Sequence, residues 1–390
     1  EVLHQHQGLR VLRMRGGHYA RNSPFFTIRR LLRRELAIDE ASPDVAGKVL
    51  TGWVGSNAPE LLPWLPLLAI PIGAEVPSTP EVDLLAEQFR RDRLLTVTSD
   101  LAVAMLNEPV ALLAEDVHLF DTGSLDVYRQ LAARAATMPW LMIATHRSEP
   151  GFVRPDAHAI ALESLGDDEL ASLAAAAGAM AGSEAGGIDV TTLAQRAGGN
   201  PLFLLELVGA FQESGTDELP ETIESLVTTR IDLLSAPDRV LLREAAVSGN
   251  VVDTQLIADA FDRRELAEAG RWQQLSDFLV DERPNVFRFR HGLYRDVAYS
   301  GLSYRRRREA HLAIGGALEA RSSSDLVAVA PLLSDHFDRG RDRIRAWEYA
   351  VLGGDAAQAN YANTEAINLY ERALRNADPD DAAGRGRIAE

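Results

Sequence analysis

Short apolar runs alternate with amphipathic stretches over the first part of the chain. Residues 9–14 alternate between apolar and polar positions and predict a short strand. The continuous apolar run Val110–Ala114 predicts a strand buried on both faces, as in a parallel sheet covered by helices, and a second apolar run, Trp140–Ala144, predicts a further strand. Ala159–Leu162 is a further predicted short strand.

Helical spacing fills the intervals between these runs. The segment "SPFFTIRRLLRREL" predicts a helix, residues 55–80 predict short helices or irregular structure, and a helix is expected from Glu81 to about Met105. Ser124 starts another, with Leu125, Tyr128 and Ala132 on one face. Strands that alternate with helices indicate a parallel α/β sheet.

After about residue 164 the pattern becomes mostly helical. Residues 286–289 are a lone alternating strand, and residues 305–374 are helical again. The last helix carries a regular apolar stripe formed by Ala366, Leu369, Tyr370, Ala373 and Leu374.

Composition narrows the classes of protein. The 390 residues include no cysteine, which removes disulfides and thiolate chemistry and fits a reducing compartment. We find no signal peptide and no apolar run long enough to span a membrane, so a cytoplasmic protein without a membrane partner is expected. The net charge of −17 opposes direct nucleic-acid binding.

Two acids follow the first buried run directly. Glu115 and Asp116 come after Ala114, and ligands of open α/β sheets bind outside the carboxyl ends of strands. Glu115 would be the acid on the metal side, holding Mg²⁺, and Asp116 the acid that orients a water. The second run ends in Thr145-His146-Arg147, where Arg147 can sense a γ-phosphate. The alternatives are a polar turn after an apolar strand and a surface salt bridge for Arg147.

Five segments resemble the ATPase region of bacterial STAND-type regulators, which often join a nucleotide cyclase or a LuxR-type DNA-binding domain to an AAA-like ATPase and TPR repeats. "LLAEDVHLFDTGSLDVYRQLA" is similar to the Walker B segment and "LMIATHR" to the sensor-1 strand. "AGGNPLFLLELV" is similar to a helix start in that family, "FRFRHGLYRDVAYSGL" to the end of its winged-helix domain, and "TEAINLYERAL" to a TPR helix.

The resemblance implies a fold class and domain boundaries. We expect an α/β parallel-sheet P-loop NTPase remnant, followed by an all-α region with a winged helix and TPR-like helices. The expected boundaries are 1–164 for the NTPase core, 165–219 for a helical lid, 220–304 for the winged helix and 305–390 for the TPR-like helices.

The resemblance also assigns site residues. Glu115 and Asp116 match the paired acids, although the family more often has two aspartates, and Arg147 matches sensor 1. Pro201 matches a proline near the adenine. His291 resembles a histidine that contacts the β-phosphate, although Gly292 follows it where relatives have aspartate.

Pro201 and His291 each have a structural alternative. Pro201 can be the first residue of a helix capped by Asn200. His291 can be a core histidine beside Phe287 and Phe289.

The phosphate-binding loop G-x-x-x-x-G-K-[ST] is not in the sequence. Its nearest match is Gly47-Lys48, which Val49 follows and Ser42 precedes in place of the first glycine. Because Glu1 is not methionine and residues 1–8 resemble the end of a helix, we expect an N-terminal truncation. We therefore expect this chain to bind ATP weakly or not at all. We also expect its first 160 residues to be poorly stable, because the strand that carries the loop would be missing.

The main functional hypothesis is a regulatory ATPase module that uses ATP and Mg²⁺ as a switch in the intact protein, with protein partners on the TPR-like helices. Hydrolysis is not expected of this chain alone. The second hypothesis is a nucleotide-independent protein-interaction scaffold. The third, DNA binding by a winged helix near residues 220–300, conflicts with the charge. The run Arg305–Arg308 predicts a solvated helix face.

Overall fold

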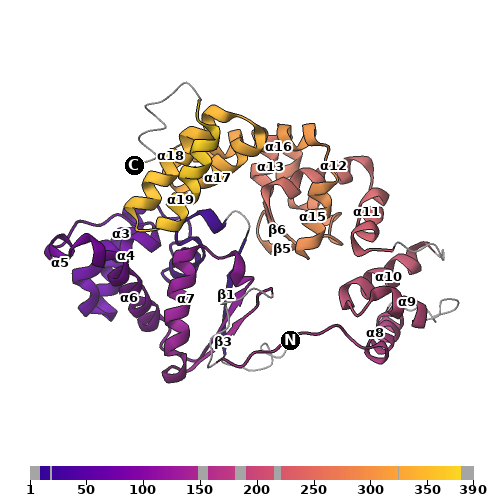
Figure 1. Cartoon of the computed structure of the whole chain (residues 1–390), viewed down its shortest axis with the longest axis horizontal. Coiled ribbons are helices and arrows are strands. Elements are labelled where there is room, and N and C mark those ends of the chain that lie inside the picture. The colour runs from indigo at the N-terminus through magenta and orange to yellow at the C-terminus, as the bar shows by residue number, and fades with distance from the viewer. Residues whose placement is uncertain are drawn as a thin grey trace. The chain divides into compact units, whose positions relative to one another are not determined.

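The computed structural model describes residues 9–17, 20–147, 157–180, 190–214, 221–323 and 325–378. The segment 1–8, predicted to be the end of a helix, lies outside these residues. The chain forms two compact units (Figure 1). The first unit combines Glu1–Arg154 with Leu318–Glu390, and the second unit is Pro155–Ala317.

A three-stranded parallel sheet lies at the centre of the first unit. Its strands are β1 (Arg10–Arg15), β2 (Val110–Glu115) and β3 (Trp140–Ala144), in the order β1-β2-β3. The register aligns Met14 with Ala114 and Ala114 with Ala144. The three strands expected in the first 145 residues are therefore confirmed, as is their parallel arrangement.

Helices pack against one face of this sheet in the part of the chain that the structure describes. Alternate strand residues such as Leu12 and Leu112 share a core with α2 (Phe26–Glu35), α6 (Glu87–Met105) and α7 (Thr122–Arg134) (Figure 1). On the opposite face of β3, Leu141 is 49% exposed and Ile143 is 39% exposed. The expected burial of both faces of the Val110–Ala114 strand is confirmed for all but Leu113, which is partly buried, since the other four residues are at most 2% exposed.

Further helices complete the first part of the chain. They are α3 (Pro43–Asn57), α4 (Leu65–Ile72) and α5 (Pro80–Leu84), with the 3-10 helix η2 (Pro59–Trp64). The helix expected from Glu81 is broken, because Leu85 and Ala86 adopt extended backbone angles between α5 and α6. Shorter 3-10 turns occur at η1 (Ala20–Asn22), η3 (Val117–Leu119) and η4 (Ala135–Thr137).

The C-terminal helices belong to the first unit. They are α17 (Leu326–Gly340), α18 (Arg343–Ala359) and α19 (Asn363–Asn376). On α19, Ala366, Leu369 and Ala373 are buried, which confirms the amphipathic stripe, although Leu374 at its end is 38% exposed. Helix α16 (Tyr304–Arg321) connects the two units along the chain.

Helices α8 (Asp167–Met180), α9 (Val190–Ala197) and α10 (Pro201–Ser214) share one apolar cluster of the second unit. A second cluster joins helices to a small antiparallel sheet. Its helices are α11 (Ile223–Leu233), α12 (Ala236–Ala245), α13 (Thr254–Ala260), α14 (Ala269–Gln273) and α15 (Gly292–Ser300), with the 3-10 turns η5 (Ala246–Ser248) and η6 (Arg264–Ala267).

The small sheet corrects one expectation. Val286–Phe289 is β6, the middle strand of the order β4-β6-β5, between β4 (Val251–Asp253) and β5 (Leu279–Arg283). The prediction of a lone strand is wrong because β4 is very short and β5 ends in charged residues, so neither has an alternating apolar pattern.

The strand predicted at Ala159–Leu162 is also wrong. This segment has no regular secondary structure, and Ile160 and Leu162 are 75% and 94% exposed. A short apolar run forms a strand only where a neighbour supplies backbone partners and a buried face.

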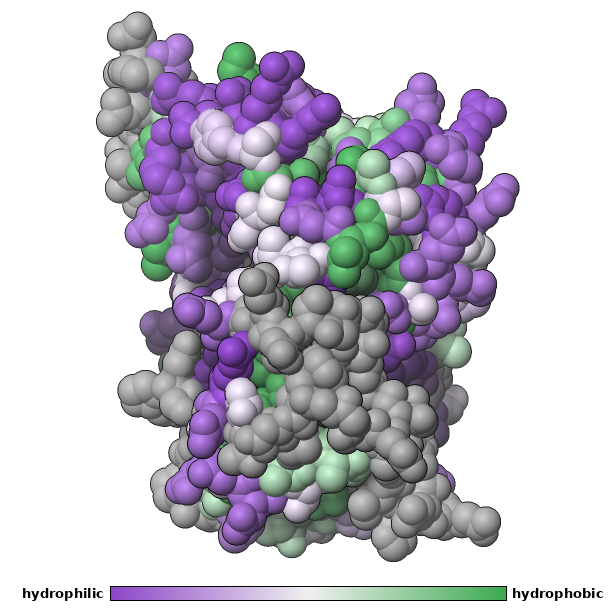
Figure 2. Space-filling view, turned by 90° about the vertical axis from the view of Figure 1, so that its right-hand side faces the viewer, coloured by the Kyte–Doolittle hydropathy of each residue, from purple (hydrophilic) through white to green (hydrophobic). Residues whose placement is uncertain are grey.

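Hydrophilic residues cover much of the described surface visible in Figure 2, with paler and hydrophobic patches between them. In the described part of the chain, no helix combines the length and the apolar composition that crossing a bilayer requires.

Candidate functional site

The acidic turn after β2, residues 115–117, is fixed to both neighbouring strands. The Glu115 carbonyl oxygen accepts a hydrogen bond from the Gly16 N–H, 2.9 Å away, at the end of β1. The Asp116 N–H donates to Thr145 Oγ1 at 3.1 Å, and the Val117 N–H donates to the Thr145 carbonyl oxygen at 3.0 Å. Glu115, Asp116 and Thr145 therefore meet at the carboxyl edge of the parallel sheet.

The backbone of this turn has little freedom. Asp116 has a φ of 54°, in the left-handed region that most side chains avoid. A Cβ atom at Gly16 would lie 2.4 Å from the Asp116 carbonyl oxygen, so only glycine permits this approach. The left-handed φ and the close approach of Gly16 restrict the backbone of Asp116 at the sheet edge.

Glu115 has a partner that the sequence did not reveal. Arg15 stands directly opposite it in the β1–β2 register, and its Nε forms an ion pair with Glu115 Oε2. The two side chains are 26% and 31% exposed. The local sequence pattern shows that each of the two residues ends a strand. It does not show which strands pair or in what register, because pairing depends on residues far apart in the sequence.

Arg147 follows the same edge. It comes two residues after Thr145 and is exposed, and its carbonyl oxygen accepts a hydrogen bond from His146 Nδ1 at 2.6 Å. The structure therefore brings the segment that carries Arg147 to the rim where the acidic turn lies.

Pro201 occupies the first turn of a helix. It is the first residue of α10, and Asn200 Oδ1 accepts hydrogen bonds from the N–H groups of Leu202 at 3.0 Å and Phe203 at 3.2 Å. Gly199 before it has a φ of 83° and lies against Ser164. These contacts fit the alternative that Pro201 starts a capped helix.

His291 precedes α15 at the N-cap position. Its ring is largely exposed and meets the Tyr294 ring edge-on, with centroids 5.1 Å apart. Partial burial lowers the pKa of His291, and the nearby Glu206 carboxylate opposes that shift. The alternative of a core histidine is wrong, because Phe287 and Phe289 fill the core and His291 does not.

A buried polar cluster links the two apolar clusters of the second unit, and no local sequence pattern predicts it. Glu206 of α10 is 7% exposed and accepts hydrogen bonds from the Tyr294 hydroxyl and from Arg230. Arg230 also lies 3.7 Å from Asp277. Burial, followed by the Glu206 carboxylate, raises the pKa of Tyr294. Glu206 and Tyr294 are 88 residues apart, so no local pattern pairs them.

The donor set at the acidic turn does not by itself fit Mg²⁺. Because Glu115 is ion-paired with Arg15, Asp116 is the remaining carboxylate of the pair. Within the described ranges, no group of three or more His, Asp or Glu side chains is placed to hold a metal ion. Magnesium normally takes one or two carboxylates together with phosphate oxygens and waters, so further ligands would have to come from a bound nucleotide.

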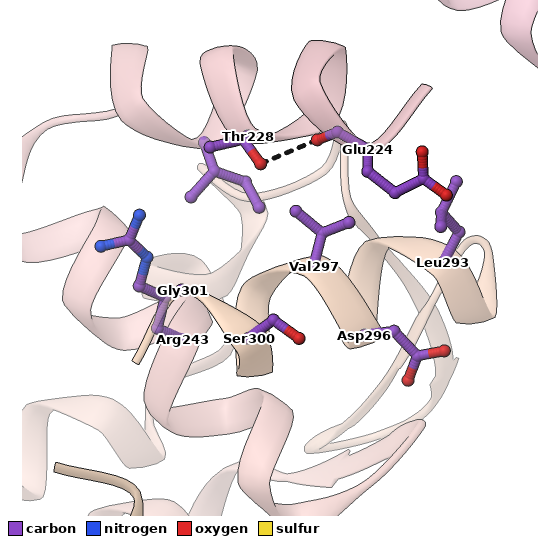
Figure 3. Close-up of a pocket in the computed structure, with 9 residues that line it drawn as sticks. Glu224, Thr228, Arg243, Leu293, Asp296, Val297, Ser300 and Gly301 are labelled. Carbon is purple, nitrogen blue, oxygen red and sulfur yellow. Dashed lines mark hydrogen bonds between the residues drawn. The ribbon is translucent and has the colours of Figure 1, made fainter. Parts of the chain in front are cut away.

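A pocket of about 530 Å³ lies in the second unit, between α11 and α15. Figure 3 shows Val297 pointing into it, with Arg243 at one end and Glu224 at the other. The Thr228 hydroxyl at its rim donates to the Glu224 carbonyl oxygen at 2.7 Å. None of the five site residues predicted from the sequence lines this pocket.

Comparisons with known proteins show a structural likeness but no detectable sequence relative. No protein-family profile matches the chain, and no curated protein sequence is detectably similar to it. Among solved structures, the chain is similar to a Signal Transduction ATPase with Numerous Domains (STAND) protein with a tetratricopeptide repeat sensor from Pyrococcus horikoshii. The TM-score is 0.46 and the identity 12%, over 97% of this chain and 58% of that protein's length. A likeness at this level establishes neither the fold nor the function of the chain.

Proposed function

We propose that the chain is a regulatory module of a STAND-type ATPase, a switch whose nucleotide lies at the carboxyl edge of β2. The observation that carries this proposal is the acidic turn, in which Asp116 follows the central strand and donates its N–H to Thr145 of the next strand. Ligands of open parallel sheets bind at this edge. The five ordered sequence segments described above give independent support.

The three residues predicted at the edge of the parallel sheet have distinct roles in the proposal. Asp116 orients the attacking water, and Arg147 reaches the γ-phosphate from the neighbouring strand. Glu115 assists once Arg15 releases it. A bound Mg²⁺ would neutralise phosphate charge, with the nucleotide and waters completing its ligands. The phosphate-binding loop is not among the 390 residues, so the proposal requires that a loop from outside this sequence hold the phosphates.

Calorimetric titration with magnesium-ATP tests the proposal on two proteins. The 390-residue chain should bind weakly or not at all, whereas a longer product of the gene that carries a G-x-x-x-x-G-K-[ST] loop should bind. In the longer protein, Asp116→Asn should lower ATP hydrolysis by at least ten-fold. The matched control is Glu108→Gln, an exposed acid that precedes β2 and so lies toward the opposite edge of the sheet.

Tight magnesium-ATP binding by the 390-residue chain would refute the expectation that the phosphate-binding loop is needed. A loop-containing protein that neither binds ATP nor responds to Asp116→Asn would refute the nucleotide switch itself.

The second candidate function is a protein-interaction scaffold without nucleotide chemistry. The Arg15–Glu115 ion pair favours it, because it occupies the acid that a metal would need. Absence of any phosphate-binding loop upstream in the gene would select this function. Direct DNA binding is not supported, because Arg263 and Arg271, near the small sheet, are ion-paired with Glu244 and Asp238.

A further inference from the structure

The C-terminal helix α19 reaches the beginning of α7. Glu365 of α19 is 1% exposed, and its Oε1 accepts a hydrogen bond from the Thr122 N–H at 2.7 Å. Thr122 is the first residue of α7, a position where the backbone N–H has no partner inside the helix. A residue 243 positions away along the chain therefore satisfies this donor.

A second contact lies at the turn between α18 and α19. Arg91 of α6 donates to the Tyr361 carbonyl oxygen and, through Nη2, to Asp126 of α7 at 2.7 Å. Arg90 donates to the Tyr361 hydroxyl at 3.3 Å, and the Tyr361 ring packs against the main core of the first unit. The turn and the first part of α19 are thus both attached to α6 and α7 (Figure 1).

The contact through Glu365 carries a built-in cost. Its second oxygen, Oε2, is buried without a hydrogen-bond partner. The Asp121 carboxylate nearby is also fully buried, and the charge on Glu365 disfavours ionisation of Asp121. Two buried like charges and an unsatisfied acceptor oppose docking. The hydrogen bond between Glu365 and Thr122 therefore contributes little net stability. A weak contact of this kind can be broken at a small cost in free energy.

The acidic turn lies a short distance along the chain from this contact. The segment 116–121 runs from the turn through η3 to Asp121, with the Leu119 N–H bonded to the Asp116 carbonyl oxygen. At its far end Asp121 accepts hydrogen bonds from Phe25 N–H and Ser124 N–H, both at 2.8 Å. A shift of the α7 start would therefore act directly on the backbone that positions Asp116.

We propose that α19 is a releasable clamp on the start of α7, through which the C-terminal helices control the acidic turn. Release of Glu365 from Thr122 loosens residues 116–122 and changes the position of the Asp116 side chain. A protein partner that binds α17–α19 and pulls α19 away would operate this clamp. Only the chemical use of the acidic turn rests on the proposed function, since the clamp is defined by contacts within the first unit.

Hydrogen exchange of single amides in the 390-residue chain tests the clamp without any nucleotide. Glu365→Ala should accelerate exchange of the Thr122 amide at least ten-fold, because no other acceptor serves this N–H in the described structure. The Val117 amide, which bonds Thr145, should accelerate as well, since the two ends of the segment are coupled. Glu365→Gln keeps the acceptor and removes the charge, so it should slow Thr122 exchange at least two-fold.

The control is Glu371→Gln on the exposed side of the same helix, which should leave both amides as in the unmodified chain. If Glu365→Ala unfolds the first unit, Arg91→Ala, which removes the second contact, gives the same readout. Faster Thr122 exchange with an unchanged Val117 amide would overturn the coupling. No change at Thr122 in any variant, or faster exchange in Glu365→Gln, would overturn the clamp itself. None of these outcomes depends on whether a longer protein binds ATP.

Discussion

At the scale of single residues, the buried carboxylate of Asp121 accepts hydrogen bonds from the N-termini of two helices, α2 and α7. It accepts hydrogen bonds from the N–H groups of Phe25, Thr27 and Ser124, before α2 and inside the first turns of α2 and α7. Burial raises the pKa of Asp121 from 3.8 to about 6, and the hydrogen bonds from Ser124 and Thr27 counter that shift. Helix N-termini favour a negative charge, but here desolvation outweighs them.

The raised pKa gives a pH prediction. A carboxyl group that binds its proton more tightly in the folded state stabilises the protein most below its unfolded pKa of 3.8, and that stability is lost as pH rises through about 6. Protonated Asp121 should therefore contribute on the order of 3 kcal/mol to the unfolding free energy of the first unit at low pH, and this contribution should disappear as the pH rises from 3.8 to about 6. Asp121→Asn should remove this term while lowering stability overall, because an amide cannot accept from all three donors. Denaturant unfolding at several pH values measures both; parallel pH profiles for the two proteins would contradict the assignment.

Tyr294 and Glu206 give a second residue-scale prediction. Tyr294→Phe removes the donor to the buried Glu206 carboxylate and leaves the ring contacts to Phe278 and His291 in place. Loss of a hydrogen bond to a buried charged group should cost about 1–3 kcal/mol. Glu206→Gln and the double variant complete a mutant cycle in urea unfolding, and the pair should show a coupling energy. Additive single effects would mean that the hydroxyl and the carboxylate do not interact.

The residues predicted from the sequence are those that local pattern can show. Glu115 and Asp116 were found because charge begins abruptly where an apolar run ends. Arg15 and Glu365 were missed because their roles depend on partners 100 and 243 residues away. An isolated glutamate on an amphipathic helix is normally solvated, and only tertiary packing distinguishes a buried one.

At the scale of elements, prediction succeeded where a pattern was long or continuous. The run Trp140–Ala144 became β3 with the predicted bounds, and Val110–Ala114 became β2 with Glu115 added. The failures were short segments without their own partner, such as Ala159–Leu162. Strands are stabilised by neighbouring strands, so the structure of a short apolar segment is ambiguous until the sheet is known.

Asn200 allows a test of how its side chain stabilises the start of helix α10. Its side chain caps α10, and Asn200→Ala should destabilise the α8–α10 cluster by about 1 kcal/mol, because two backbone N–H groups lose their acceptor. Hydrogen exchange along residues 201–214 measures the loss locally. Asn200→Asp keeps an acceptor and should behave like the original residue. Equal exchange in Asn200→Ala and in the unmodified chain would mean that the cap contributes nothing.

At the scale of the whole molecule, the first unit is built from two distant stretches of chain, and the second unit is inserted between them. The sequence indicated a change of character near residue 164 but not that the last helices return to the first unit. That return rests on single long-range contacts, such as Arg91 with Tyr361, which periodicity does not encode. The expected boundaries at 164, 219 and 304 remain predictions about domains.

The insertion leads to the last prediction. Residues 157–317 contain two apolar clusters joined by the Glu206–Arg230–Tyr294 contacts, with Trp272, Phe278 and Phe289 almost completely buried. A segment with its own core should fold alone, so this fragment should unfold cooperatively in urea with protected amides in β5 and β6. Deletion of residues 318–390 should instead destabilise the remaining first unit, because it removes the partners of Arg91 and of the Thr122 N–H. Non-cooperative unfolding of the fragment, together with an unaffected first unit after the deletion, would show that the two units are not the folding units of this chain.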